Sequence, residues 1–440
     1  DDDPVKRKMK IHGIPVFGTI EEIKAVTNRL EAHEIIVALP SASTATKQRI
    51  LASSEGCTAP IKILPNMKQL LGDPVSLQQV RPMSLEDLLQ REPIQTDRQE
   101  LHPLLEGKTV LVTGAGGSIG SELCRQIASY RPESLVLFER YENSLHALLL
   151  ELRAAFPAVG VLPVIGDVTV PERVAEVFRQ TSPDLVFHAA AHKHVPLMEL
   201  NPKEAVRNNV LGTRVVAEAA LVAGVDRFVL ISTDKAVNPT SVMGVTKRIA
   251  EQVIRGFNHR GRTKYSVVRF GNVLGSNGSV VPLFTEQIRK GGPITVTDPE
   301  IKRFFMTIPE AVQLVLQASV LGQGGEVFVL DMGEQIKIVD LARNMIVLSG
   351  LVPGKDIEIV FTGLRPGEKL YEELFDESEQ VESTAHEKIN RAVGALPSAD
   401  FEQWLDQLEV NLLQWSEDEL FLQLRQRVPS FTPTMPQRVS

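Results

Sequence analysis

The sequence contains little cysteine, and this scarcity limits what the protein can be. Only Cys57 and Cys124 occur among its 440 residues, far apart and without a Cys-x-x-Cys pair. This excludes a disulfide framework and a cysteine zinc site, and it fits a reducing compartment such as the cytoplasm. No apolar run approaches the roughly 18 residues that span a bilayer, and no signal peptide is visible. The net charge of −8 gives no general attraction to nucleic acid or to anionic lipid.

The rest of the composition is that of an ordinary globular protein, with 43% hydrophobic and 23% charged residues. A chain of 440 residues can form two or three domains with sizeable cores. It begins at Asp1 without a methionine, so we expect it to be a fragment of a longer protein.

Strand-like apolar runs recur after residue 105, and amphipathic stretches of helical length separate most of them. The runs lie at residues 109–112, 134–138, 161–165, 184–187, 227–231, 266–270 and 326–330. Alternation of strand and helix predicts an α/β fold with a doubly wound, Rossmann-like parallel sheet. From about Gly275 the pattern breaks into glycine- and proline-rich pieces, which predicts a smaller lobe over the carboxyl edge of the sheet.

A glycine-rich loop follows the first of these strands and precedes an amphipathic helix. Residues 113–120 read Thr-Gly-Ala-Gly-Gly-Ser-Ile-Gly, a GxxGxxG pattern in which Ile119 takes the last glycine position of the strict GxGxxG. Such a loop lets the backbone approach a pyrophosphate and aims a helix N-terminus at the anion. We therefore predict a dinucleotide site that includes Gly114, Gly117, Ser118, Ile119 and Gly120.

The residues that close the next strand bear on which dinucleotide binds. Glu139 lies 19 residues after Gly120, where a carboxylate would bind the ribose hydroxyls and repel a 2′-phosphate. Arg140, its neighbour, would attract that phosphate. We predict NAD, with NADP as the less favoured cofactor.

A third pattern concerns proton transfer. Residues 233–235, Thr-Asp-Lys, leave the strand at 227–231 at the carboxyl edge, where open α/β sheets bind ligands, and Asn238-Pro239 favours a turn there. Twelve residues after Lys235 stands Lys247, and Met243 lies four residues before it. A Tyr-x-x-x-Lys pair on one helix face would have tyrosine at that place, and a thioether has no proton to give. Either the chain is catalytically dead, or proton transfer belongs to Thr233, Asp234 and Lys235.

The combination of these motifs resembles the extended short-chain dehydrogenases that make bacterial surface sugars. The resemblance is carried by the loop at 113–120, by residues 187–199, 208–213, 231–248 and 269–276, and by Leu-Arg-Pro-Gly-Glu-Lys-Leu at 364–370. It is nearest to the large UDP-N-acetylglucosamine 4,6-dehydratases, in which methionine usually replaces the tyrosine. Related dTDP-glucose 4,6-dehydratases keep the tyrosine and carry Thr-Asp-Glu. The large members have transmembrane helices upstream, so the resemblance implies a parent protein attached to the cell membrane.

The resemblance implies a hydro-lyase reaction on a UDP-sugar. NAD takes the C4 hydride, water leaves from C5 and C6, and the hydride returns to C6, so that the cofactor stays bound and is recycled. Asp234 would protonate the C6 hydroxyl, Lys235 would take the C5 proton, and Thr233 would bind the C4 hydroxyl or relay its proton. Lys247 would hold the nicotinamide ribose.

The resemblance also extends the cofactor and substrate sites. Asp167 and Val168 correspond to an adenine contact, while Ala189 and Ala190 line the cofactor. Predicted substrate ligands are Lys193, Asn272, Arg303, Arg365 and Glu368, since guanidinium groups suit a diphosphate and Glu368 would take the uridine ribose.

The implied division of the chain has five parts. They are a partial N-terminal α/β nucleotide-fold-like domain, a linker, an NAD-binding Rossmann domain, a sugar-nucleotide-binding lobe and a C-terminal extension. Their predicted bounds are 1–90, 91–106, 107–274, 275–380 and 381–440, with the strand at 326–330 returning to the sheet.

The proposed chemistry requires two shifted pKa values. Free lysine titrates near ~10.4, so the pKa of Lys235 must fall, and we expect burial, Lys247 and the nicotinamide cation to lower it. The pKa of Asp234 must rise for it to act as an acid. Because direct contact would push both pKa values the wrong way, we expect the two side chains to face different substrate atoms instead of pairing.

Other interpretations remain open at this level. Proton removal at C5 without elimination would make the protein a sugar-nucleotide epimerase, and Met243 supports a silent NAD-binding scaffold or sensor. His188, His192 and His194 lie close in sequence, but without further ligands we expect no metal site. The sequence does not identify the sugar epimer, the C5 stereochemistry, the acceptor of the C4 hydroxyl proton, or whether a homo-oligomer forms.

Overall fold

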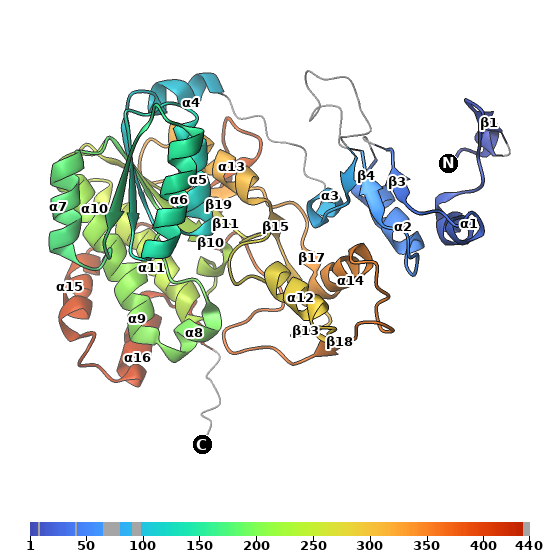
Figure 1. The fold of residues 1–440 in the computed structure, drawn as a ribbon. Helices are drawn as coiled ribbons and strands as arrows, with labels where there is room; N and C mark the ends of the chain where they lie inside the picture. Colours follow the sequence, from blue (N-terminus) through green and yellow to red (C-terminus); the bar gives the residue numbers. More distant parts are fainter. Residues whose placement is uncertain (8, 40–41, 65–79, 90–97, 434–440) are drawn as a thin grey trace. The chain divides into compact units, whose positions relative to one another are not determined.

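The chain forms two compact units in the computed structural model (Figure 1). The structure describes residues 1–7, 9–39, 42–64, 80–89 and 98–433. The larger unit comprises Pro93–Asn277, Arg303–Gln335 and Leu364–Ser440, and the smaller comprises Asp1–Glu92, Gly278–Lys302 and Ile336–Gly363. Part of the predicted linker, 91–97, and the last residues of the predicted C-terminal extension, 434–440, lie outside the described residues. The five predicted domains stay a prediction.

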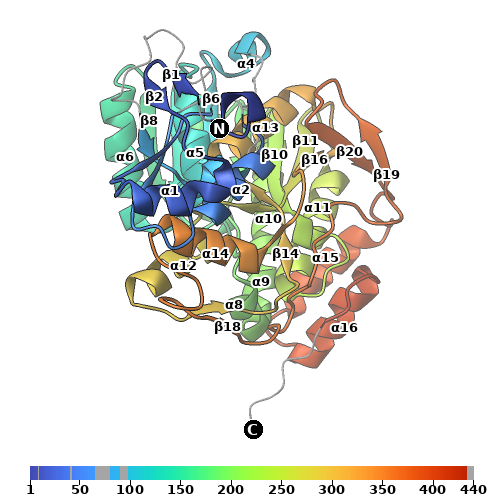
Figure 2. The same ribbon diagram turned by 90° about the vertical axis from the view of Figure 1, so that its right-hand side faces the viewer.

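A nine-stranded sheet forms the centre of the larger unit as described, with β19 at one edge and β8 at the other (Figure 2). In spatial order the strands are β19 (Gln380–Ser383), β20 (Ile389–Val393), β16 (Val327–Leu330), β11 (Lys264–Phe270), β10 (Arg227–Thr233), β9 (Leu185–His188), β6 (Thr109–Thr113), β7 (Ser134–Glu139) and β8 (Gly160–Ile165). From β8 to β16 all neighbours are parallel. The predicted α/β class with a doubly wound, Rossmann-like sheet is therefore confirmed.

Strands β20 and β19 are antiparallel additions that the sequence did not reveal. Their residues alternate between buried and exposed or are mostly exposed. An edge strand with one solvated face lacks the continuous apolar run of a central parallel strand. This explains why neither strand is among the runs that the sequence predicts.

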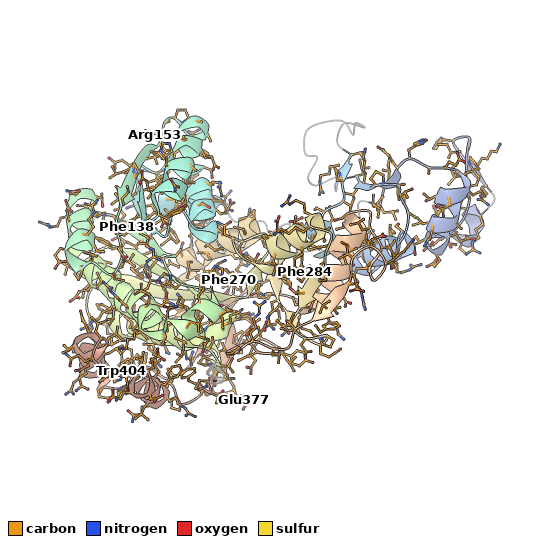
Figure 3. The ribbon with its side chains drawn as sticks, turned by 60° about the horizontal axis from the view of Figure 1, so that its bottom comes forward. Phe138, Arg153, Phe270, Phe284, Glu377 and Trp404 are labelled. Atoms are coloured by element: carbon orange, nitrogen blue, oxygen red, sulfur yellow. The ribbon has the colours of Figure 1, made fainter. Side chains whose placement is uncertain are left out.

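Helices cover both faces of the sheet. One face packs against α4 (Arg98–Leu105), α5 (Ser118–Ala128), α6 (Glu142–Ala155) and α13 (Ile308–Leu321). The other packs against α7 (Pro171–Thr181), α10 (Gly212–Ala223) and α11 (Val242–Phe257), and its apolar cluster continues into α15 (Phe401–Asn411) and α16 (Glu417–Arg427). In Figure 3, Phe138 lies among the side chains of the sheet region and Trp404 among those of the C-terminal helices.

The strand order places the functional segments together. The chain runs β6, β7, β8 toward one edge and then returns through β9 to β10 and β11 on the other side of β6. This reversal is a topological switch point, and ligands of such sheets bind there, outside the carboxyl ends of the strands. The loops that follow β6, β7, β9 and β10 all leave from this edge. Short helices α8 (Val195–Leu200) and α9 (Pro202–Val206) follow β9, and β12 (Asn272–Val273) pairs with β15 (Phe305–Met306).

The smaller unit contains a three-stranded sheet in the order β3, β4, β5. Its elements are β1 (Lys10–Ile11), β2 (Ile14–Pro15), α1 (Ile23–Arg29), β3 (Ile35–Val37), α2 (Thr44–Ser53), β4 (Ile61–Ile63), β5 (Arg81–Pro82), α3 (Leu85–Leu89), α12 (Val280–Arg289), β13 (Ile294–Val296), β17 (Ile336–Lys337), α14 (Ile338–Leu348) and β18 (Ile359–Phe361). β14 (Lys302–Arg303) lies where the chain passes from one unit to the other. Within the described ranges no helix combines the length and the apolar character that crossing a bilayer requires.

Candidate active site

The glycine loop packs tightly, and a side chain at Gly114 or Gly120 would collide with the backbone. A Cβ on Gly120 would lie 2.0 Å from the carbonyl oxygen of Gly114, and a Cβ on Gly114 would lie 2.8 Å from the backbone of Ala190. Gly114 also has a φ of +66°, which disfavours any other residue. Gly117 caps α5, which begins at Ser118, and Ile119 packs beside the apolar core. The loop therefore presents backbone N–H groups and a helix N-terminus, the features that hold a pyrophosphate.

Glu139, at the end of β7, is fixed by backbone donors. Its Oε2 accepts from the N–H of Gly116 at 3.0 Å, and its Oε1 accepts from the N–H groups of Arg140 and Tyr141, both at 2.9 Å. The carboxylate thus lies against the glycine loop, where the sequence predicted a ribose ligand. Arg140 Nη1 lies 3.7 Å from Asp167 Oδ2, so a carboxylate already accompanies its positive charge.

The segment after β9 is held by buried polar side chains. Asn209 Oδ1 accepts from the N–H of His192 at 2.8 Å, and Asn209 Nδ2 donates to the carbonyl of His192 at 3.0 Å. This brace fixes the backbone that carries Ala189 and Ala190. Val168 is 4% exposed and its side chain belongs to the apolar core, which leaves its backbone as the part that could meet an adenine.

His188 has a structural position. Its two ring nitrogens lie 2.7 Å from Thr113 Oγ1 and 3.1 Å from Thr213 Oγ1. Burial lowers the pKa of His188 to about 3, and the charge of Lys247 adds to this. The ring is therefore a neutral bridge between β6 and α10. Among the described residues, no group of three or more histidine, cysteine or acidic side chains is arranged to hold a metal ion.

The acid–base residues occupy a turn that leaves β10. After Thr233 the chain enters a short 3-10 helix, Asp234–Ala236, and the Thr233 side chain caps it. Asp234 is fully buried. Thr233 Oγ1 donates to Asp234 Oδ1 at 2.8 Å, and no described residue offers a hydrogen-bond partner to Asp234 Oδ2.

Two expectations about Lys235 are wrong. Its Nζ lies 3.0 Å from Asp234 Oδ1, so the two side chains pair directly. Burial lowers the pKa of Lys235, but the carboxylates of Asp234 and Glu372 outweigh it, and the net shift is upward. Sequence reasoning failed because the second carboxylate comes from a distant segment. Lys235 Nζ also donates to Asn272 Oδ1 at 3.0 Å, so Asn272, a predicted substrate ligand, contacts the predicted base.

Lys247 and Met243 lie on α11. Lys247 Nζ donates to the carbonyl of Ile231 at 2.7 Å, and burial lowers its pKa to about 8 although the nearby Glu251 acts in the opposite direction. Met243 is 3% exposed and packs in a small apolar cluster with Met198 and Ala205. The methionine in the tyrosine position is thus a packing residue.

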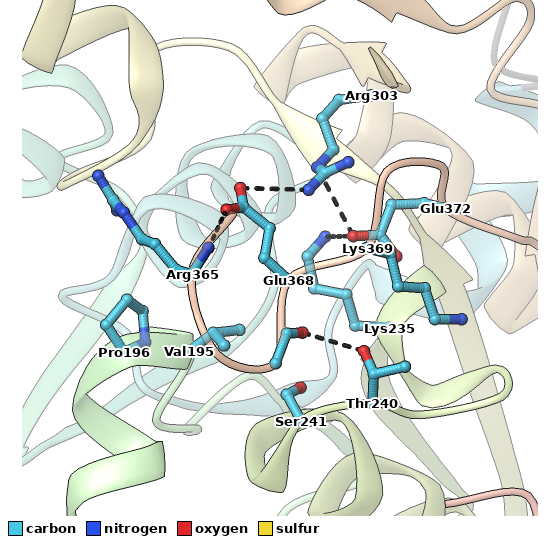
Figure 4. Close-up of a pocket in the computed structure, with 11 residues that line it drawn as sticks. Val195, Pro196, Lys235, Thr240, Ser241, Arg303, Arg365, Glu368, Lys369 and Glu372 are labelled. Atoms are coloured by element: carbon cyan, nitrogen blue, oxygen red, sulfur yellow. Dashed lines mark hydrogen bonds and ion pairs between the residues drawn. The ribbon is translucent and has the colours of Figure 1, made fainter. Parts of the chain in front are cut away.

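A pocket opens beside this turn (Figure 4). Four predicted residues line it: Lys235, Arg303, Arg365 and Glu368. The sequence did not single out its other lining residues, which are Val195, Pro196, Thr240, Ser241, Gly367, Lys369 and Glu372. Lys193 is not among them; its Nζ donates to Ser276 Oγ at 3.3 Å, and burial together with the charge of Lys235 lowers its pKa.

The segment 364–372 brings four charged side chains to the pocket. Arg303 Nη2 lies 3.3 Å from Glu368 Oε1, and the backbone N–H of Arg365 donates to Glu368 Oε2 at 3.2 Å. Lys369 Nζ donates to the carbonyl of Val237 at 3.0 Å, and Thr240 Oγ1 donates to the carbonyl of Gly367 at 3.0 Å. These contacts hold the segment against the turn that carries Lys235.

Glu372 is the functional side chain that sequence reasoning missed. It is 4% exposed, and its Oε1 lies 3.6 Å from both Lys235 Nζ and Arg303 Nε. Burial raises its pKa, against the opposing charge of Lys235. Its neighbourhood in the chain has neither helix nor strand, so no periodicity marked it; an acid two residues beyond the quoted Leu-Arg-Pro-Gly-Glu-Lys-Leu stretch was the available signal.

Comparison with known proteins identifies relatives of this chain. A family model described as "Polysaccharide biosynthesis protein" matches residues 110–393. The chain is 50% identical over 380 residues to the probable polysaccharide biosynthesis protein EpsC of Bacillus subtilis, covering 86% of this chain but only 63% of EpsC. It is 35% identical over 270 residues to the UDP-N-acetylglucosamine 4,6-dehydratase (inverting) of Campylobacter jejuni, covering 60% of this chain and 76% of that enzyme.

Two further comparisons widen the range of activities. A UDP-glucose 4-epimerase of Rickettsia bellii is 35% identical over 288 residues, covering 63% of this chain and 80% of that enzyme. The X-ray structure of Pen from Bacillus thuringiensis superimposes with a TM-score of 0.60 at 35% identity, covering 67% of this chain and 89% of Pen. The chain is thus related to sugar-nucleotide dehydratases and epimerases.

Proposed function

Because the chain belongs to the polysaccharide biosynthesis protein family, we propose that it is a sugar-nucleotide 4,6-dehydratase, a hydro-lyase acting on a UDP-N-acetylhexosamine with NAD bound. UDP-N-acetylglucosamine is the proposed substrate, the one named for the relative from Campylobacter jejuni. The product would be the 4-keto-6-deoxy sugar nucleotide, used in polysaccharide or glycan synthesis.

The observation that carries the proposal is the partly buried chain of hydrogen bonds from Thr233 through Asp234 to Lys235. Thr233 Oγ1, Asp234 Oδ1 and Lys235 Nζ are joined by contacts of 2.8 and 3.0 Å at the edge of a charged pocket. Elimination across a C–C bond needs an acid for the leaving oxygen and a base for the carbon acid, and positioned side chains of this kind supply both.

Cofactor residues in the structure fit a dinucleotide. Gly114, Gly117 and Gly120 leave the backbone open to a pyrophosphate, and Glu139 lies beside that loop. Lys247 lies on the first turns of α11, behind the acid–base turn. When bound, NAD would accept the hydride from C4 of the sugar and return it to C6. We favour NAD over NADP because Asp167 accompanies the charge of Arg140, so a 2′-phosphate would meet two carboxylates.

Thr233 and Asp234 handle one of the two protons. We assign to Thr233 Oγ1 the proton that leaves the C4 hydroxyl, and to Asp234 the proton that joins the departing C6 hydroxyl to form water. Since Thr233 already donates to Asp234 Oδ1, one relay connects the two oxygens of the sugar. Such a relay would replace the tyrosine that Met243 cannot supply.

Lys235 handles the other proton. As a neutral amine it takes the proton from C5, which the C4 ketone has made acidic, and it gives a proton back to C5 when the hydride returns to C6. Both protons and the hydride are then accounted for, and the enzyme ends in its starting state. The positive groups of Arg303 and Arg365 would hold the diphosphate at the pocket mouth.

Proton NMR of the protein with NAD and UDP-N-acetylglucosamine in deuterated water tests the proposal. We expect the C6 methyl signal of the 4-keto-6-deoxy product, with deuterium at C5. The configuration at C5 would show whether the enzyme retains or inverts that centre. UDP-glucose serves as the matched substrate that lacks the N-acetyl group.

Unchanged substrate in the presence of demonstrably bound NAD would contradict the proposal and favour a silent scaffold. A product of unchanged mass would favour the second candidate, a sugar-nucleotide epimerase. The similarity to the UDP-glucose 4-epimerase supports that candidate.

A further inference from the structure

Lys235 is flanked by two carboxyl groups, and only one of them follows from its local sequence. Asp234 Oδ1 lies 3.0 Å and Glu372 Oε1 lies 3.6 Å from Lys235 Nζ. Figure 4 shows the Glu372 contact together with the ion pair from Glu372 to Arg303. A lysine between two ionised carboxylates is held as an ammonium, which cannot take a proton from carbon.

One carboxyl oxygen of Glu372 makes no hydrogen bond to the described residues. Its Oε2 is buried and finds no hydrogen-bond partner among the described residues. An ionised carboxylate with a buried, unpartnered oxygen is costly, and a carboxyl group in such a place tends to bind a proton instead. Consistent with this, burial raises the pKa of Glu372, and the adjacent Asp234 adds to the rise.

We propose that Glu372 is a positioning residue that sets the charge of Lys235. The ionised carboxylate holds Lys235 as an ammonium, and the protonated carboxyl group releases it as an amine. This inference rests on the proposed function, because it matters for catalysis only if Lys235 is the base. The proton balance is closed: the N–H bond of the ammonium breaks, the electron pair stays on Nζ, and the proton forms an O–H bond with Glu372.

The transfer requires a small movement. A separation of 3.6 Å is an ion-pair distance, beyond hydrogen-bond range. Lys235 Nζ also donates to Asn272 Oδ1, and a flexible four-carbon stem lets it leave that acceptor for Glu372. The other charged groups that face Glu372 are Asp234, Arg303 and Lys369, while Lys235 also faces Arg303 and lies near Lys193. None of these is on the same segment as Lys235 except Asp234.

A pH series of lysine labelling tests this directly. The folded protein is exposed briefly to acetic anhydride at each pH, and the acetylation of Lys235 is measured by peptide mass spectrometry. The variants are Glu372→Gln, which is permanently uncharged, and Glu373→Gln, a matched control. Glu373 Oε1 accepts from Asn238 and its Oε2 from Lys369, and it does not line the pocket.

The labelling midpoint of Lys235 should fall by roughly 1 to 3 pH units in Glu372→Gln, the usual effect of removing one adjacent opposite charge. In Glu373→Gln it should stay at the parent value. Glu372→Asp keeps a charge that is withdrawn by one methylene, so its midpoint should lie between those of the parent and Glu372→Gln. Should Glu372→Gln fail to fold by circular dichroism, the aspartate variant applies the same test. Equal midpoints in the parent and in the folded Glu372 variants would overturn the proposal.

Turnover gives a second readout. In Glu372→Gln the acid-side inflection of the dehydration rate should move to lower pH with the labelling midpoint, with kcat affected more than KM. A purely structural role would reduce turnover at every pH and leave the inflection in place. If the parent makes no product at all, the proposed function fails, yet the labelling series still decides whether Glu372 controls Lys235.

Discussion

The two halves of the site are built in different ways. The proposed dinucleotide half uses a continuous loop, 113–120, whose glycines and backbone N–H groups would do the binding. The acid–base half collects side chains from β10, β12, Arg303 and the segment 364–372, which are far apart in the chain. In the loop, an added methyl group at Gly114 or Gly120 would collide with the backbone. In the acid–base half, the pKa of Lys235 depends on the balance between burial and the surrounding charges.

Two buried lysines show the same contrast. Burial dominates at Lys247, and its pKa falls to about 8. At Lys235 burial acts in the same direction, but two carboxylates from different segments reverse the outcome. The pKa of Lys247 is therefore determined by its surroundings on β10 and α11. The pKa of Lys235 depends on Asp234 and on the distant Glu372.

Replacing Lys235 should have the largest effect. In Lys235→Ala the base is lost, and we expect kcat for dehydration to fall by about 10²- to 10⁴-fold, measured by product NMR or a 4-keto assay. Circular dichroism checks that the variant is folded, since the buried carboxyl groups of Asp234 and Glu372 each lose an ion-pair partner. Lys264→Ala is the control, because the hydrogen bond that Lys264 Nζ donates to Gln323 Oε1 lies at an exposed position. Near-normal turnover in Lys235→Ala would refute its role as base.

Adding one methyl group to the glycine loop should have the next largest effect. In Gly120→Ala the new Cβ would lie 2.0 Å from the carbonyl oxygen of Gly114, so the loop must open. We expect the Kd for NAD to rise by about 10-fold or more, equivalent to about 1.4 kcal/mol, as measured by calorimetric titration. Gly256→Ala on α11 is the matched change, since its Cβ would meet only Glu402 Oε1 at 3.5 Å. Unaltered affinity in Gly120→Ala would remove this loop from the cofactor site.

The same contrast explains how much the sequence predicted. The parallel sheet, the glycine loop and the turn after β10 depend on short-range patterns, and each pattern lies within one stretch of the chain. The presence of Glu372 and Asn272 beside Lys235 depends on where separate segments meet in space. Periodicity carries no information about such meetings. The antiparallel strands β19 and β20 were not predicted because strands with many exposed residues have a weak apolar pattern.

The lowered pKa of Lys247 should make the stability of the folded protein depend on pH. Its pKa in the folded protein is about 8, below the ordinary value of 10.5, so between these values the unfolded chain binds the extra proton. Stability from this group therefore rises with pH across that window, and the destabilising contribution is fully present below about pH 8. In Lys247→Met without cofactor, the gain in thermal midpoint over the parent should be larger at pH 7 than at pH 10. A gain that is equal at both values would contradict the depressed pKa.

Arg140 should have the smallest effect, and it tests the cofactor preference. Its guanidinium lies 3.7 Å from Asp167 Oδ2 on a half-exposed site, and such exposed pairs contribute only ~0.2–1 kcal/mol. We expect Arg140→Ala to change the Kd for NAD by less than about 5-fold and to leave NADP the weaker ligand. Arg153→Ala, in the last turn of α6, is the control for removing one positive charge from the same unit. If Arg140 instead holds a 2′-phosphate, its removal would weaken NADP binding selectively, and the carboxylate of Glu139 would then no longer decide which dinucleotide the loop accepts.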